Sequence, residues 1–294
     1  MRAIIQISNK QHERNDLELI DELLFLKICG KMLINYYFDF LYQLGIKELL
    51  IAANDIKILE YRLQFIDKLN LDVKFIKSSN SKESYLNNFN QLQDEELLII
   101  ENFGFLKNHA NTINADFFKQ SDNCIFKNHS FKIYYIKNHS NNLNMKLLKR
   151  SALLDVKKVD TLEDYFLISN HILKNLSNRY FLPGYSNEDE IILGENVEIE
   201  KGCKLIAPVI IMDNVKICKD TKIGPNTVIN KNVFIEQGCK VSNSIVYDNI
   251  YINSNLNFED KLVLSDFIVD KNNKKVYNID TKFVSKNFTD PLKF

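Results

Sequence analysis

The sequence predicts two domains, an α/β domain with a Rossmann-like sheet followed by a parallel β-helix of six-residue repeats. Apolar strand segments alternate with amphipathic helix segments over the first 175 residues, and an uninterrupted six-residue period runs from 191 to 250. We place the boundary near residue 180. The α/β domain then covers residues 1–180, and the β-helix with its C-terminal cap covers residues 181–294.

The elements of the first domain follow in chain order from apolar periodicity and turn residues. We expect strands at residues 3–7, 48–53, 73–76, 97–100 and 153–159, and helices at 32–44, 55–65, 81–92 and 162–174. Gly45 closes the first helix, Asn54 caps the second, and Thr161 with Asp164 forms a capping box for the last. Strands that alternate with such helices predict parallel βαβ units covered on both faces. Between residues 110 and 145 the pattern weakens, and we interpret this stretch, including residues 131–136, as a small excursion.

In the second domain, apolar or β-branched residues occupy the first and third positions of nearly every six-residue unit. These pairs are Ile191/Leu193, Val197/Ile199, Cys203/Leu205, Val209/Ile211, Val215/Ile217, Thr221/Ile223, Thr227/Ile229, Val233/Ile235, Cys239/Val241 and Ile245/Tyr247. The sixth positions carry turn formers such as Asn, Gly, Pro and Asp. Two-residue alternation joined to a fixed turn is typical of a parallel β-helix, in which each short strand buries its side chains against the next coil.

This repeat resembles the hexapeptide repeat of left-handed β-helices, in which three units form one coil. A little over three coils are therefore expected. The alternative, a sandwich with evenly spaced strands, would need loops of varied length. A stack of repeats leaves open ends, so we expect the segment 251–294 to cap one end or to contact another subunit.

Composition excludes several classes of function. The 38 basic and 38 acidic residues balance, and no basic cluster is interleaved with aromatic residues, so nucleic acid is not an expected partner. No apolar stretch reads as a secretory signal or a membrane span, so the cytoplasm is the expected location and a membrane is not an expected partner. The five cysteines lack metal or disulfide spacing. We expect Cys203 and Cys239, at inward repeat positions, to be small core side chains.

An α/β domain followed by such coils resembles the layout of the sugar-1-phosphate nucleotidyltransferases, or NDP-sugar pyrophosphorylases. The resemblance covers about half the chain. Its segments are the first strand at 1–5, Gly-Lys-Met-Leu-Ile at 30–34, Leu-Gly-Ile-Lys-Glu at 44–48, Asp-Thr-Leu-Glu-Asp-Tyr at 160–165 and Gly-Pro-Asn at 224–226. It implies attack by a sugar-1-phosphate on the α-phosphate of a nucleoside triphosphate, with release of pyrophosphate. In that family a glycine-rich turn, an arginine and a lysine bind the phosphates, and two aspartates hold Mg²⁺.

The chain departs from the family at its phosphate-binding motifs. The Gly-x-Gly-Thr-Arg turn falls on residues 9–13, which contain no glycine and end in Glu13. Arg14 is the candidate replacement for the arginine. The family's lysine falls on Leu23, and Lys27 is the nearest replacement.

The metal-binding positions also depart from the family. The first metal aspartate falls on Phe103, and Glu101 could supply a carboxylate only with a register slip. The second falls on Lys158, and Asp155 is a nearby carboxylate.

The candidate residues are therefore Arg14, Lys27 and Glu101 for catalysis, Ser8, Asn9, Lys10, Arg14, Asn102 and Lys158 for the nucleotide and its phosphates, and Glu101 and Asp155 for Mg²⁺. The alternative for Lys10, Arg14 and Lys158 is that they are solvated surface charges.

Three functions compete. The first is a degenerate family member that acts as a regulatory or assembly subunit of an active pyrophosphorylase, or as an NDP-sugar sensor. The second is a divergent active enzyme of sugar-nucleotide and polysaccharide biosynthesis, with Mg²⁺ as its cofactor. The third is a hexapeptide acyltransferase, which would need a general base, yet no histidine lies beyond His171. The expected partners are a nucleotide or NDP-sugar, a second copy bound through the β-helix, and an active pyrophosphorylase.

Overall fold

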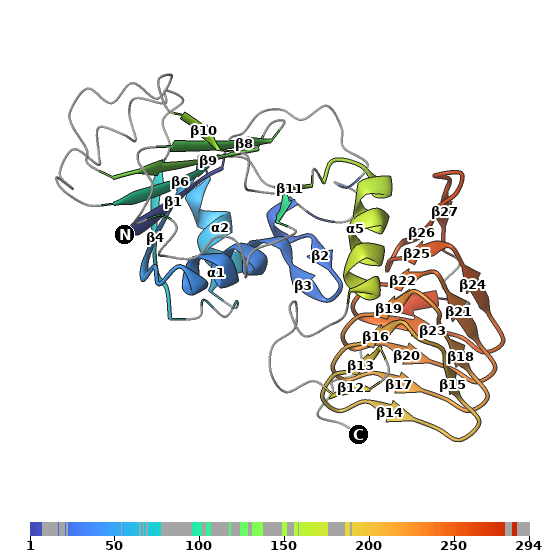
Figure 1. Cartoon of the computed structure of the whole chain (residues 1–294). Coiled ribbons are helices and arrows are strands. Elements are labelled where there is room, and N and C mark those ends of the chain that lie inside the picture. The colour runs from blue at the N-terminus through green and yellow to red at the C-terminus, as the bar shows by residue number, and fades with distance from the viewer. Residues whose placement is uncertain are drawn as a thin grey trace. The chain divides into compact units, whose positions relative to one another are not determined.

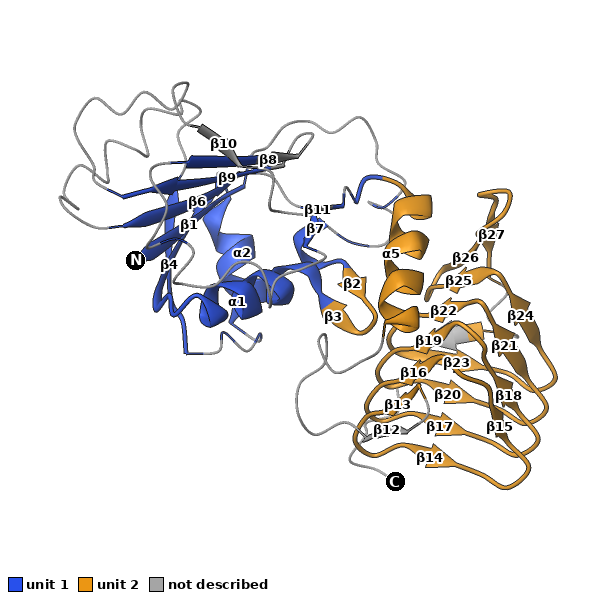
Figure 2. Cartoon of the chain, viewed as in Figure 1, with its two compact units in different colours: residues 1–26, 32–160 blue, residues 27–31, 161–294 orange. Residues whose placement is uncertain are grey.

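The structure is a computed structural model that divides the chain into two compact units. It describes residues 1–7, 17, 21, 23–53, 55–64, 66, 68, 70–77, 96–101, 104–106, 118, 124–128, 131–137, 149–151, 156–157, 159–175, 186–188, 190–279 and 284–286. Unit 1 comprises residues 1–26 and 32–160, and unit 2 comprises residues 27–31 and 161–294 (Figures 1 and 2). This division assigns residues 27–31 and 161–180 to the coil unit, whereas the sequence places a boundary near residue 180.

Unit 1 is built on a mixed sheet in the order β10-β8-β9-β6-β1-β4-β5. Its strands are β1 (Arg2–Gln6), β4 (Glu48–Ala53), β5 (Asp72–Lys77), β6 (Leu97–Glu101), β8 (Cys124–Asn128), β9 (Phe131–Ile136) and β10 (Lys149–Ser151). The four strands β6-β1-β4-β5 are parallel. The rest of the sheet is mixed, because β9 runs antiparallel to both of its neighbours, β6 and β8. The predicted strands of the parallel part are confirmed, and every residue of β6 is buried.

The excursion predicted for residues 110–145 is wrong at residues 131–136, which form β9 in the middle of the sheet. Tyr134 and Ile136 join Ile4, Leu97 and Ile99 in one apolar cluster. The expectation of an all-parallel sheet fails for the same reason. The run 131–136 is rich in aromatic and β-branched residues, which favour a strand, but its short connection to β8 permits only an antiparallel neighbour.

Two helices connect the parallel strands and lie on the same side of the sheet (Figure 1). α1 (Leu33–Gln43) buries seven side chains, because apolar and aromatic residues occupy nearly all positions on the face that it turns to the core. It ends before Gly45, whose φ of +71° favours glycine. α2 (Ile56–Leu63) begins at Asp55, which caps it in place of the predicted Asn54, since the Asp55 side chain accepts the N–H of Ile58. No helix among the described residues has the length and apolarity needed to cross a bilayer.

Short elements complete the N-terminal part of the chain: the 3-10 turn η2 (Leu23–Phe25) and the strands β2 (Lys27–Ile28), β3 (Lys31–Met32), β7 (Phe105–Leu106) and β11 (Val156–Lys157). β11 pairs antiparallel with β7 and confirms the strand predicted at 153–159 at residues 156–157, whereas residue 159 is described and is not part of a strand. The helix predicted at 81–92 and the turn at 182–184 lie outside the described residues.

In unit 2, α5 (Leu162–Lys174) has the predicted capping box. The Thr161 hydroxyl accepts the N–H of Asp164 at 3.1 Å, and the Asp164 carboxylate accepts the N–H of Thr161 at 3.1 Å. The helix continues until Asn175 and buries seven side chains.

The rest of unit 2 winds through three sheets of stacked short strands. The first sheet contains β12 (Ser186–Glu188), β13 (Ile191–Leu193), β16 (Val209–Ile211), β19 (Thr227–Ile229), β22 (Ile245–Val246), β25 (Lys261–Val263), β26 (Phe267–Asp270) and β27 (Val276–Asn278). The second contains β14 (Glu198–Ile199), β17 (Lys216–Ile217), β20 (Phe234–Ile235), β23 (Ile250–Ile252) and β28 (Val284–Lys286). The third contains β15 (Lys204–Leu205), β18 (Lys222–Ile223), β21 (Lys240–Ser242) and β24 (Asn257–Glu259). Within each sheet the successive coil strands pair in parallel, which is the arrangement of a parallel β-helix (Figure 1).

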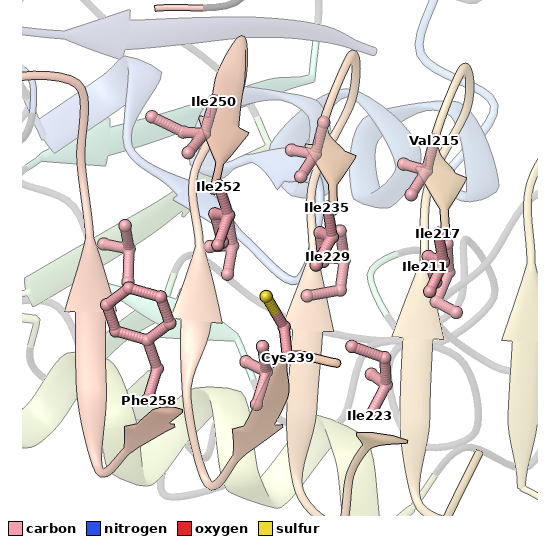
Figure 3. Packing of buried hydrophobic residues seen from close by; sticks show 14 of the residues in the cluster. Ile211, Val215, Ile217, Ile223, Ile229, Ile235, Cys239, Ile250, Ile252 and Phe258 are labelled. Carbon is pink, nitrogen blue, oxygen red and sulfur yellow. The ribbon is translucent and has the colours of Figure 1, made fainter. Parts of the chain in front are cut away.

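The first and third positions of the repeat point into the coils, as predicted. Side chains such as Val215, Ile217, Ile229 and Ile235 stack in one core cluster (Figure 3). Cys239 belongs to this cluster and is fully buried, and Cys203 packs partly buried against it. The prediction that both cysteines are core side chains is confirmed, and all five cysteines are free thiols.

The tenth predicted unit is out of register by one residue. Val209 lies beside Thr227, eighteen positions later, whereas Val228 lies beside Ile245, seventeen positions later. The ninth unit is therefore one residue short, and it ends at Asn243 with a φ of +49°. In the tenth unit Val246, rather than Ile245, joins the core cluster. A shortened turn preserves the stacking of the coils, so the strict period predicted over sixty residues is wrong at this turn.

The coils also extend further than predicted. β23, β24 and β25 continue the parallel stacking as far as Val263, so the expectation of a little over three coils is too low. The predicted cap is confined to later strands: β26 pairs antiparallel with β25, β27 pairs antiparallel with β26, and β28 pairs antiparallel with β23. On the cap, Lys261 pairs with Asp270 at 2.6 Å.

The first sheet is buried on both faces, which distinguishes it from the other two. Its outward second positions carry Ile192, Ile210, Val228, Ile245 and Leu262, which are at most 3% exposed. The equivalent positions of the third sheet carry exposed lysines at 204, 222 and 240. α5 and residues 27–31 belong to the same unit and lie along the first sheet (Figure 2). A β-carbon at Gly30 would lie 2.6 Å from the sulfur of Met212, so the turn at Gly30 rests directly on a coil.

Candidate functional site

The sheet of unit 1 changes direction between β1 and β6. From β1 the chain moves to β4 and then β5 on one side, and it returns to β6 on the other side. In an open sheet with parallel strands, ligands bind outside the carboxyl ends of the strands at such a switch point. Here those ends are Gln6 on β1 and Glu101 on β6, which are paired in register.

A row of polar residues crosses three strands at this edge. Gln6 lies beside Glu101, and Glu101 lies opposite Lys132 on β9. Because β9 is antiparallel to β6, its first residues reach the edge where the parallel strands end. Tyr134 lies on the same face of β9, two residues further along.

The carboxylate of Glu101 receives two donors from β9. The Tyr134 hydroxyl donates to Glu101 Oε2 at 3.2 Å, and the Lys132 ammonium lies 3.5 Å from the same oxygen. The side chain of Glu101 is 7% exposed and that of Lys132 is 25% exposed. The structure therefore places the nearly buried carboxylate of Glu101 next to the partly exposed ammonium of Lys132.

The chain beyond Glu101 is tied to α1 by one tyrosine. The Tyr37 hydroxyl donates to the carbonyl oxygen of Gly104 at 2.6 Å and accepts the Gly104 N–H at 3.1 Å. Burial raises the pKa of Tyr37, so the hydroxyl stays protonated and keeps both bonds. These two hydrogen bonds hold the backbone at Gly104, three residues after the end of β6, against α1.

Side chains that bind metals do not cluster in the described part of the chain. No three His, Cys, Asp or Glu side chains come together anywhere in the described ranges. The structure places the ammonium of Lys132 3.5 Å from a carboxylate oxygen of Glu101, where it would compete with a cation for that oxygen. Mg²⁺ prefers several oxygen ligands at short distance, and the predicted second carboxylate, Asp155, lies outside the described residues, so the metal-binding role of Glu101 stays a prediction.

Lys27 belongs to unit 2, whereas Glu101 belongs to unit 1. The Lys27 ammonium forms an ion pair with Asp248 in the tenth repeat, and both side chains are less than one-fifth exposed. Its N–H donates to the Tyr247 hydroxyl at 3.3 Å, and its carbonyl oxygen accepts the Tyr165 hydroxyl at 2.7 Å. These contacts fasten β2 between α5 and the coils. The role of Lys27 as a phosphate ligand stays a prediction.

Seven of the predicted site residues lie outside the described residues. They are Ser8, Asn9, Lys10, Arg14, Asn102, Asp155 and Lys158.

Sequence reasoning did not identify Lys132 and Tyr134. Their signal was the alternation of Lys132, Tyr134 and Ile136 within an apolar run, which is the two-residue period of a strand. The alternation predicts a strand but not its neighbour, so the proximity of Lys132 to Glu101 required the sheet topology.

One comparison with known families bears on the coils. Residues 205–274 match the family model of the GMPPB C-terminal domain. That domain is the hexapeptide-like β-helix region of sugar-phosphate nucleotidyltransferases. The matched range begins in β15 and ends just before β27, so it includes the coils that the repeat count missed. A comparison with curated proteins found no match.

Proposed function

We propose that this chain is a sugar-1-phosphate nucleotidyltransferase-family protein that has lost efficient catalysis. It acts in sugar-nucleotide and polysaccharide biosynthesis as a regulatory or assembly subunit, or as an NDP-sugar sensor. The observation that carries this proposal is the match of residues 205–274 to a nucleotidyltransferase β-helix domain, together with a mixed α/β sheet on its N-terminal side. On the same grounds we infer left-handed coils and a Rossmann-like origin for the sheet.

The proposed loss of catalysis rests on the absent motif residues. The segment aligned with the glycine-rich turn has no glycine, and the aligned metal positions are Phe103 and Lys158. Removing one group that stabilises transition-state charge costs about 10²- to 10³-fold in rate, so the combined losses would leave little turnover.

A regulatory subunit or a sensor without catalysis must act by binding other molecules. We propose that a nucleotide or NDP-sugar binds at the carboxyl edge of β1 and β6, and that the coils carry a second copy of the chain or an active pyrophosphorylase. The coil unit supports an assembly role because β14 and β15 are the terminal strands of their sheets, and the end of a repeat stack suits docking.

Two measurements on the full chain test this function. Calorimetric titration with nucleoside triphosphates and NDP-sugars, with and without Mg²⁺, should detect binding of at least one compound. A pyrophosphate-release assay over a panel of triphosphates and sugar-1-phosphates should detect no enzyme-dependent rate. Binding to none of these compounds would contradict the sensor role, and co-purification with an active pyrophosphorylase would distinguish a subunit from a sensor.

A divergent active enzyme is the second candidate, because Glu101 ends the strand that resembles the one carrying the family's first metal aspartate. Pyrophosphate release that disappears in Glu101→Ala would establish this candidate and reject the first.

A further inference from the structure

We propose that Lys132 supplies the cation of a phosphate-binding site at the carboxyl edge of the unit 1 sheet. The ligand class is the di- or triphosphate of a nucleotide or NDP-sugar. This inference rests on the proposed function and adds a residue that the family's motifs do not provide.

The position of Lys132 is the first argument. It occupies the second residue of β9, directly opposite Glu101, and Glu101 is in register with Gln6 on β1. The lysine therefore lies next to the switch point between β1 and β6, where the sheet topology places a ligand. Because β9 runs antiparallel to β6, the first residues of β9 lie at the edge where β6 ends.

The state of its ammonium is the second argument. Its distance to Glu101 Oε2 is 3.5 Å, compared with 2.6 Å in the pair between Lys261 and Asp270. An ammonium has three donors, and in the described part of the chain the Lys132 ammonium contacts one carboxylate. A side chain that is 25% exposed can turn its other donors toward an anion without leaving Glu101.

The charge balance of the edge is the third argument. Glu101 alone, at 7% side-chain exposure, would repel a phosphate, and a buried carboxylate is costly without a counterion. Lys132 neutralises it, and the Tyr134 hydroxyl satisfies the same oxygen. The pair itself has no net charge, and it leaves donors of the Lys132 ammonium available to an anion. Lysine is a frequent phosphate ligand as a point charge, and here it would act without a glycine-rich turn.

Binding of inorganic pyrophosphate and a panel of NDP-sugars to the full chain tests this inference. We would compare the wild type with Lys132→Met, Lys132→Arg and the control Lys137→Met, which removes the lysine that directly follows the opposite end of β9. Loss of a charged hydrogen bond predicts that Lys132→Met raises Kd about 10- to 100-fold. Lys132→Arg and Lys137→Met should stay within about two-fold of the wild type.

Lysine acetylation of the wild type, followed by mass spectrometry, gives a second readout that needs no variant. Pyrophosphate or the bound NDP-sugar should protect Lys132 and leave Lys137 unchanged. If the wild type binds an NDP-sugar but Lys132 is neither protected nor required, the inference is wrong and the proposed function stands. If Lys132 is protected by pyrophosphate while no nucleotide or NDP-sugar binds, the sensor role fails and the anion site stands.

Discussion

The outward face of the first coil sheet should contribute as much to stability as the coil interior. Ile210 occupies an outward repeat position on β16 and is 0% exposed, whereas Lys222 occupies the equivalent position on β18 and is exposed. Ile210→Ala removes three carbon groups, which at about 0.8 kcal/mol each amounts to about 2.4 kcal/mol of lost burial. The unfilled cavity adds to this, so we expect a total within about 2–5 kcal/mol. Lys222→Ala should change stability by less than about 0.5 kcal/mol.

Native-state hydrogen exchange is the suitable assay, because a chain with two compact units need not unfold in one transition. Amides of β16, β19 and β22 would be followed as a function of urea in the wild type and both variants. Their opening free energy should fall in Ile210→Ala only. Equal opening free energies in Ile210→Ala and Lys222→Ala would show that α5 and residues 27–31 do not cover this face, and would refute the reasoning.

Three further predictions concern charged groups. Lys27→Met and Asp248→Asn should each destabilise unit 2 by about 1.5–3 kcal/mol in the same exchange experiment, and additive effects in the double variant would contradict a direct pair. The hydrogen bond from Lys261 holds the pKa of Asp270 below the ordinary value of about 3.9 for an aspartate. The ionised Asp270 therefore stabilises the fold above about pH 3.9, and this stabilisation is lost as the pH falls through the lowered pKa. Asp270→Asn should therefore flatten the acid limb of the stability curve, and an unchanged limb would count against this assignment. The hydrogen bond to Glu236 raises the pKa of Tyr251 to about 12, so its contribution is complete below pH 10 and is lost between about 10 and 12. Glu236→Gln should shift one tyrosine toward a pKa of about 10 in a difference absorbance titration, and a superimposable titration would exclude the bond.

Local signals predicted most of the helices and strands of the first 175 residues. The capping box at Thr161 and the glycine after α1 are contained in a few neighbouring residues, so their local chemistry decides the helix ends. β9 was missed because its stability comes from pairing with β6, which lies thirty residues earlier in the chain. Asn54 was preferred over Asp55 as a cap because the two residues have nearly equal capping preference, and only the backbone path selects between them.

The candidate site was predictable only in part. Glu101 was a candidate because it lies two residues before the position of the family's first metal aspartate, but its neighbours Lys132 and Tyr134 approach from a strand with no sequence signal for its partner. Lys27 was a catalytic candidate because it is the lysine nearest in sequence to the position of the family's lysine. In the structure its ammonium pairs with Asp248, 221 positions away, and sequence spacing carries no information about such a contact.

The sequence by itself determined the repeat architecture, because a six-residue period of inward side chains and turn residues can bury its core only by stacking one coil on the next. Only the tertiary structure decided how the repeat is used. The shortened turn at Asn243 is tolerated because the stacking of Val246 on the coil before it outweighs the strict period. The outward face of the first sheet is buried because α5 and residues 27–31 return to it from distant parts of the chain. At the carboxyl edge of unit 1, antiparallel pairing places a lysine beside Glu101. The shortened turn, the buried outer face and the pairing of Lys132 with Glu101 each depend on contacts between segments far apart in sequence, and a local sequence pattern carries no information about such contacts.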